Sequence, residues 1–117
     1  MNDTIPGNLH VANDVLADMV GNAALECYGV VGMAAPSAAD GIAKILPASR
    51  LRRGVTVGHG EDGRLTIGLH VVLEYGVNIS AVSQNLVDSV QYMLKGIAQI
   101  DDAEVVVHVE GVKVHES

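Results

Sequence analysis

The sequence contains no phenylalanine and no tryptophan, and it has only three tyrosines. Any hydrophobic core must therefore be built from aliphatic side chains, and the chain offers no array of aromatic platforms on which nucleic-acid bases could stack. Basic residues are also scarce, because seven stand against fourteen acidic ones and give a net charge of −7. Such a charge repels phosphate backbones and anionic lipid surfaces, which argues against nucleic acid as a partner.

Cysteine and long apolar runs are equally scarce. The single cysteine, Cys27, cannot form an internal disulfide, and the N-terminus lacks the basic and apolar segments of a secretion signal. Mean hydropathy is +0.31, but no apolar run approaches the roughly 18 residues of a membrane-spanning helix. We therefore expect a cytoplasmic protein without direct membrane insertion, which reaches the inner face of the membrane only through a partner.

The clearest positive signal is a long strand followed by a change of direction. Residues 65–75 alternate between apolar and polar side chains, with Val72 as the exception, and this period of two predicts a half-buried strand. Gly76 and Asn78 follow, and these residue types suit a tight turn and a helix N-cap. The pattern predicts a strand that leads into a helix through a fixed corner.

Other stretches predict further strands. Residues 9–11 form a short alternating piece, residues 30–33 a brief buried strand, and residues 55–57 a strand that the Asp62-Gly63 turn joins to the long one. Near the C-terminal end, valines alternate with His108 and Glu110, and the alternation shifts by one residue at Gly111. A glycine at such a shift indicates a β-bulge.

Two helices are expected from apolar residues spaced by three and four. The first begins at Asn13 and continues to Cys27, and a short helix over residues 41–46 ends at Pro47. The second main helix begins near Asn78. Its apolar stripe comprises Ile79, Val82, Leu86, Val90, Met93, Leu94 and Ile97.

Together these elements predict an α+β fold. We expect a two-layer sandwich in which two main helices pack on one face of a mixed sheet of four to five strands. We expect residues 1–8 to be a flexible lead and residues 9–115 to form a single domain. A chain of 117 residues is long enough to fold in this way without disulfides.

One surface of the second helix is a candidate contact surface. Its polar face carries almost no charge, and burying amides and hydroxyls in an interface costs less than burying charges. The residues proposed for a partner surface are Gln84, Asn85, Asp88 and Gln91.

A second candidate site lies on the polar faces of two strands. His70 and His108 are followed, further along the same strands, by the carboxylates Glu74 and Glu110, and such groups can hold zinc. A solvated strand face is the competing interpretation, and it is favoured because no short ligand pair fixes the site locally. The alternative function is accordingly a small-molecule or metal-binding sensor.

Three other motifs favour structural interpretations. Cys27 lies on the apolar stripe of the first helix, as a buried unreactive cysteine does. The GVVG sequence at residues 29–32 has the form of a nucleic-acid clamp but carries valines at its centre. Arg50, Arg52 and Arg53 are consistent with a solvated linker. No phosphate-binding fingerprint or serine elbow is present, so we expect no catalytic residues, no cofactor and no enzyme.

Several segments resemble a known family when they are taken in order. They are ALECYGVVGMA, DGIAKIL, RRGVTV, HVVLEYGVNI, AVSQNLVDSVQYML and VVVHVEGVKV. Over residues 9–114 the chain is similar to the alkaline shock protein family, the envelope stress response family of Gram-positive bacteria. The EYGVNI corner and the VHVEGVKV ending are the most specific parts of this resemblance.

The resemblance implies a non-enzymatic protein of cell-envelope homeostasis. Some members of the family are held at the inner face of the membrane by a separate membrane protein. It thus implies an interaction scaffold that acts through self-association or through a membrane-anchoring partner. No active-site residues are implied.

Overall fold

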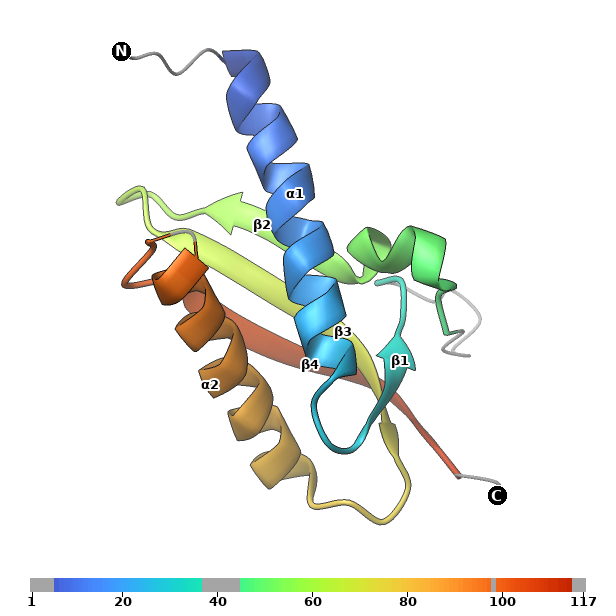
Figure 1. Ribbon diagram of the computed structural model, residues 1–117. Coiled ribbons are helices and arrows are strands. Elements are labelled where there is room, and N and C mark those ends of the chain that lie inside the picture. Colours follow the sequence, from blue (N-terminus) through green and yellow to red (C-terminus); the bar gives the residue numbers. More distant parts are fainter. Residues whose placement is uncertain (1–5, 37–44, 98, 115–117) are drawn as a thin grey trace.

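The computed structural model describes residues 6–36, 45–97 and 99–114. It confirms the predicted α+β class, with two long helices, a short 3-10 helix and a four-stranded sheet (Figure 1). In chain order the elements are α1 (Pro6–Leu25), β1 (Val30–Met33), η1 (Ala48–Gly54), β2 (Val55–His59), β3 (Leu65–Glu74), α2 (Ile79–Ile97) and β4 (Glu104–Lys113).

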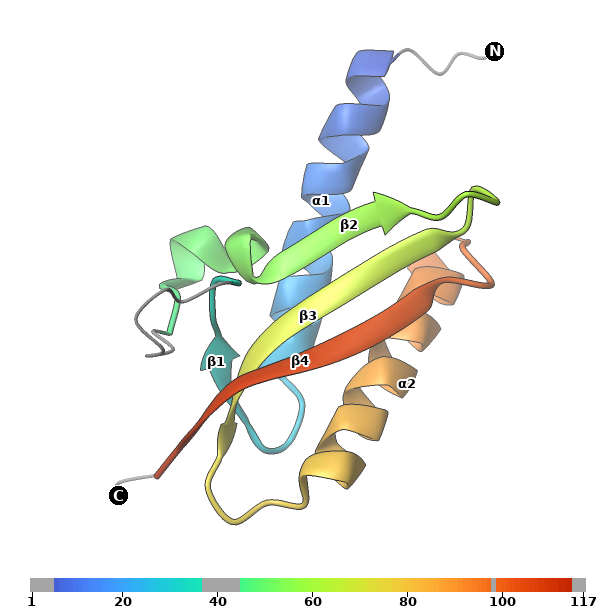
Figure 2. The same cartoon turned by 180° about the vertical axis from the view of Figure 1, so that it is seen from behind.

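Strand β3 is the centre of the sheet and pairs with all three other strands. On one edge, β4 runs parallel to it over nearly its whole length, from Thr66 opposite Glu104 to Glu74 opposite Lys113. The other edge is divided, because β2 pairs antiparallel with residues 65–69 and β1 antiparallel with residues 71–73. The sheet is therefore mixed, as predicted, and Figure 2 shows β2 and β1 following one another along the same side of β3.

Both long helices lie on one face of this sheet (Figures 1 and 2). Helix α1 covers the side of β1 and β2, and α2 covers the side of β4. Between the layers lies an aliphatic core. Its fully buried members include Val20, Met33, Ile67, Leu69, Val71, Leu73, Leu86, Val90 and Leu94.

Two details of the predicted elements need correction. Residues 9–11 are helical and not a strand, and residues 6–8 are helical and not part of a flexible lead. The first helix begins at Pro6 instead of Asn13, and the fixed φ of proline suits a first helical turn. Three alternating residues are too few to fix a period. Ile79 and Ile97, placed on the buried stripe of α2, are exposed because they lie at the two ends of the helix. The predicted helix over 41–46 lies mostly outside the described residues.

The corner between β3 and α2 forms as predicted. Gly76 has φ +96°, a conformation that a residue without a Cβ adopts at little cost. The side-chain oxygen of Asn78 accepts a hydrogen bond from the backbone N–H of Ala81 at 3.0 Å, which caps the helix. The corner thus fixes where α2 begins.

Replacing Asn78 by alanine should lower the free energy of unfolding by about 1 kcal/mol, the usual cost of losing an N-cap. Urea denaturation followed by circular dichroism measures the change. Asn85→Ala is the matched control, because Asn85 lies on the exposed side of the same helix. Equal effects of the two variants would contradict a capping role for Asn78.

Candidate functional site

A shallow hollow lies where the N-terminal half of α2 meets the turn between α1 and β1. It is lined by Tyr28, Asn78, Ala81, Val82 and Asn85, and has a volume of about 240 Å³. Cavities that hold small molecules usually measure roughly 300–1,000 Å³ and enclose their ligand. The size of this hollow is better suited to one protruding side chain of a protein partner.

The glycine at the start of the GVVG motif shapes this hollow. Gly29 has φ +88°, and a Cβ built there would come within 2.9 Å of Val82 Cγ2. The absence of a side chain therefore lets the turn approach α2 closely and places Tyr28 beside the hollow. Packing accounts for this glycine, in agreement with the structural interpretation of the motif.

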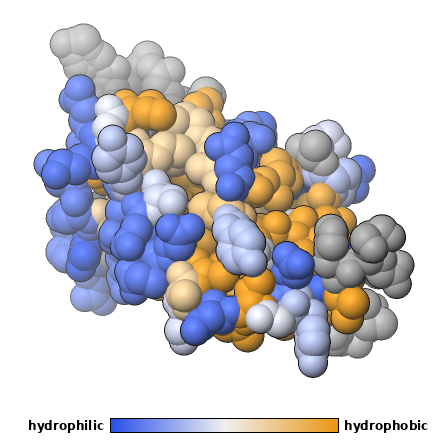
Figure 3. Space-filling model, turned by 60° about the horizontal axis from the view of Figure 1, so that its bottom comes forward, coloured by the Kyte–Doolittle hydropathy of each residue, from blue (hydrophilic) through white to orange (hydrophobic). Residues whose placement is uncertain are grey.

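Large side chains are exposed at Tyr28, which lines the hollow, and on the β3–α2 corner, to which Asn78 of the hollow belongs. Tyr28 is 77% exposed, and Tyr75 and Ile79 from the β3–α2 corner are also exposed. Figure 3, in which this end of the molecule comes forward, shows hydrophobic residues gathered between polar flanks. We call Tyr28, Tyr75, Ile79 and Asn85 the tyrosine end.

The four residues predicted as a contact surface on α2 are all exposed. Asn85 belongs to the hollow. Gln84 donates a hydrogen bond to Asp88 at 2.9 Å, and Gln91 donates to the carbonyl oxygen of Ala103 at 3.1 Å. Because Ala103 directly precedes β4, these three residues form a stripe on the β4 side of the helix.

The sequence reasoning missed the tyrosines. Tyr28 lies just beyond the last turn of α1, and Tyr92, which is 82% exposed, lies on the polar face of α2. Both tyrosines fall outside the apolar stripes of the helices. This position is the sequence feature by which they could have been identified as surface residues. Of these two tyrosines only Tyr28 lines the hollow, and it is therefore the candidate for contact with a partner.

The histidine pair comes together on the face of the sheet opposite the helices. The rings of His70 and His108 stack with their centroids 4.6 Å apart, and Nδ1 of His70 lies 2.7 Å from Oε2 of Glu110. Glu110 can reach His70 because it is the extra residue of a β-bulge between Val109 and Gly111. This bulge confirms the one predicted at Gly111. His70 is only 8% exposed.

This cluster does not have the arrangement of a metal site. Within residues 6–36, 45–97 and 99–114, no three histidine, cysteine or acidic side chains are grouped so that they could hold a metal ion. Stacked imidazoles present their faces to each other instead of directing two nitrogens at one point. The geometry explains how a histidine is accommodated in the sheet, and it gives no support to the metal-sensor alternative.

Comparison with known proteins identifies the family. The profile of the alkaline shock protein family, described as having a "cell envelope-related function", matches residues 1–114. The chain belongs to the alkaline shock protein family. The resemblance predicted from the sequence is thereby confirmed.

Relatives in the alkaline shock protein family cover nearly the whole chain. The uncharacterized protein YloU of Bacillus subtilis is 34% identical over 109 residues, which are 92% of this chain and 90% of YloU. The uncharacterized protein Spy1614 of Streptococcus pyogenes is 34% identical over 113 residues, 96% of this chain and 93% of its own. No solved structure matches. None of the described helices is both long and apolar enough to cross a membrane.

In this alkaline shock family protein the arginine cluster has a structural contact. Two nitrogens of Arg52 donate to the carboxylate of Asp18 at 3.1 and 2.8 Å, and a third lies 3.3 Å from Asp14. The hydrogen bond to Asp18 and the charge of that carboxylate raise the pKa of Arg52 above its ordinary value. These contacts tie η1 to α1, while all three arginines remain exposed, as expected of a solvated segment.

Cys27 is partly buried just after α1. Its thiol donates a weak hydrogen bond to the carbonyl oxygen of Ala23, 3.7 Å away and one turn earlier. It also packs against the core cluster. These contacts agree with the structural interpretation of this cysteine.

Proposed function

We propose that this protein is a non-enzymatic interaction module of cell-envelope homeostasis, which a membrane-anchoring protein recruits from the cytoplasm to the inner face of the membrane. The family supports the cell-envelope role. The observation that carries the proposal of a protein partner is the tyrosine end, where an exposed aromatic residue borders a hollow that is not covered by other described residues.

Tyrosine side chains at such positions are suited to protein recognition. They bring a large apolar surface and a hydroxyl group at a low cost in conformational entropy, and they are frequent among residues that dominate binding energy. Asn85 and Asn78 add amide groups at the rim of the hollow. The surface therefore combines an apolar centre with polar groups that can pair with a partner.

The experiment is capture of membrane proteins by purified variants. Tyr28→Ser should weaken retention of a specific membrane protein by about thirtyfold, which corresponds to about 2 kcal/mol for a dominant contact residue. Asn85→Arg should have a similar effect, because it places a bulky charge in the hollow.

Tyr92→Ser is the matched control, since Tyr92 is as exposed as Tyr28 but does not line the hollow. It should leave retention unchanged. Circular dichroism of each variant verifies that the fold is intact. If Tyr28→Ser and Asn85→Arg retain the same membrane proteins as the unmodified chain, the tyrosine end is not the contact surface.

A further inference from the structure

Strand β4 forms an edge of the sheet that is long and apolar. It has ten residues, and within the described part of the chain it pairs only with β3. Val106, Val109 and Val112 are exposed along it. An uncovered edge of this kind presents unpaired backbone N–H and C=O groups, which are a template for another strand.

One hydrogen bond shows which backbone N–H and C=O groups of β4 point toward β3 and which point toward the open edge. The carbonyl oxygen of Lys113 accepts from the N–H of Tyr75 at 2.8 Å, so the backbone groups of Lys113 face the β3 side. The N–H and C=O groups of successive residues in a strand point to alternate sides. The backbone groups of the neighbouring Val112 therefore point toward the open edge. Val105 lies on the same face as Val112, since they stand opposite the core residues Ile67 and Leu73.

We propose that two copies of this chain pair edge to edge through antiparallel β4 strands, with a twofold axis at His108. In this register Val105 stands opposite Val112 of the second copy, and Glu104 stands opposite its Lys113. The extra residue Glu110 is left out of the pairing in both strands. Two four-stranded sheets then become one continuous sheet of eight strands.

The charges at the two ends of β4 favour a second copy of this chain as the partner, and they favour this one register. Glu104 and Lys113 are the first and last residues of β4, both are exposed, and both lie on the face away from the helices. Antiparallel pairing of β4 with itself therefore forms two opposite-charge pairs, one at each end. A slip by two residues in either direction separates both pairs and removes their stabilising contribution.

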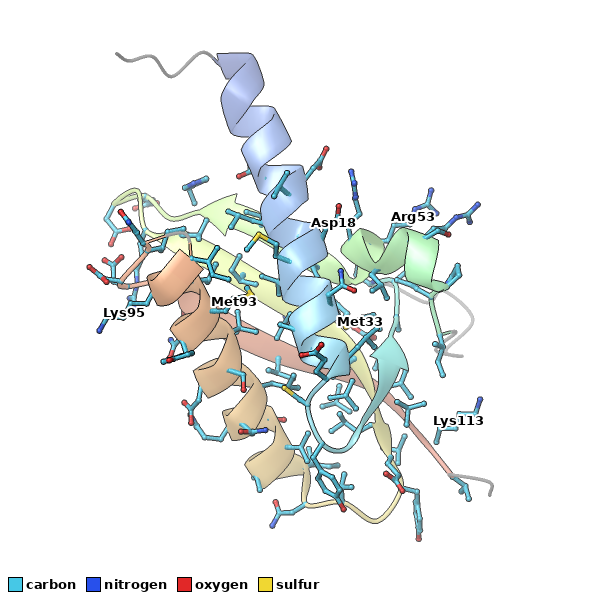
Figure 4. All side chains as sticks on the ribbon, viewed as in Figure 1. Asp18, Met33, Arg53, Met93, Lys95 and Lys113 are labelled. Carbon is cyan, nitrogen blue, oxygen red and sulfur yellow. The ribbon has the colours of Figure 1, made fainter. Side chains whose placement is uncertain are left out.

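The neighbouring helix face is compatible with this pairing. Both copies of α2 would lie on the same face of the extended sheet, and the stripe of Gln84, Asp88 and Gln91 is on the β4 side of each. Figure 4 shows Lys95, the next position of this stripe, on the side of α2 away from α1, while Met93 points toward α1. The stripe carries one acidic and one basic residue, so the two helices meet without a strong like-charge contact. Unlike the proposed recruitment, this inference does not use the tyrosine end.

Cysteine crosslinking tests the register directly. In the proposed dimer, His108 of one copy lies opposite His108 of the other. The Cα atoms of such a non-hydrogen-bonded pair lie about 4.5 Å apart, a distance that a disulfide spans. In a Cys27→Ser background, His108→Cys should form a covalent dimer under mild oxidation. Val106→Cys is the matched control, because its two copies lie about 13 Å apart along the strands. Crosslinking of Val106→Cys as fast as His108→Cys, or of neither variant, would overturn the proposal.

Charge reversal tests the same arrangement without oxidation. Lys113→Glu should weaken the dimer about tenfold in sedimentation equilibrium, because two attractive pairs become repulsive. The double variant Glu104→Lys with Lys113→Glu restores both pairs and should recover the original association. A chain that stays monomeric at about 100 µM, or a double variant that associates no better than Lys113→Glu, refutes pairing through β4.

Discussion

Replacing Leu86 by alanine should lower the free energy of unfolding by about 2–5 kcal/mol. Leu86 lies at the middle of α2 with none of its surface exposed, between the helix and the sheet. Removal of the leucine side chain leaves a cavity in the core. The core contains no phenylalanine or tryptophan side chain that could shift into this cavity. The destabilisation should therefore lie well within the range measured for buried leucines.

Chemical denaturation at constant temperature measures this change. Ile97→Ala is the control, because Ile97 belongs to the same predicted stripe but is 67% exposed. It should change the free energy of unfolding by less than about 0.5 kcal/mol. Similar losses at the two positions would mean that the burial of the α2 stripe is wrongly described.

The second large effect is expected at Gly29. Alanine there must adopt φ +88°, which costs about 1–2 kcal/mol, and its Cβ would also come within 2.9 Å of Val82 Cγ2. Relieving that contact requires the turn or the buried Val82 side chain to shift, at a further cost of about 1–3 kcal/mol. Gly29→Ala should therefore destabilise the protein by about 2–5 kcal/mol in total.

Two further variants separate these causes. Gly58→Ala is the control, because no atom lies within 4 Å of a Cβ built at Gly58. Combining Gly29→Ala with Val82→Ala removes the contact but leaves the unfavourable φ. The double variant should therefore lose less stability than the sum of the two single variants. Strict additivity would show that the contact with Val82 contributes nothing.

Much of the fold was predictable because several of its elements carry strong local signals. The alternation in β3, the turn at Gly76, the cap at Asn78 and the bulge beside Gly111 each reflect a local backbone requirement. Residues 9–11 were wrongly assigned because so short a segment fits both a strand and a helix. The hairpin of β2 with β3 was predicted from the Asp62-Gly63 turn and is present. The pairing of β1 further along the same edge of β3 could not be derived, since it depends on a contact between distant segments.

The candidate site was less predictable for the same reason. The sequence identified Asn85 as a surface residue, but the hollow depends on the approach of Gly29 to Val82 from another part of the chain. Likewise, the stacking of His70 on His108 requires the parallel register of β3 and β4. A polar face can be recognised from one helix alone, whereas a concave surface needs two elements.

The divided edge of β3 has a consequence for synthesis of the protein. Strands β1 and β2 precede or closely adjoin β3 in the chain, so one side of β3 can pair as soon as it is made. Its other side requires β4, which follows only after the whole of α2. A nascent chain that has just completed α2 therefore exposes the most apolar strand of the protein along one side. Chaperone binding during translation should concentrate in this interval, before residues 104–113 emerge.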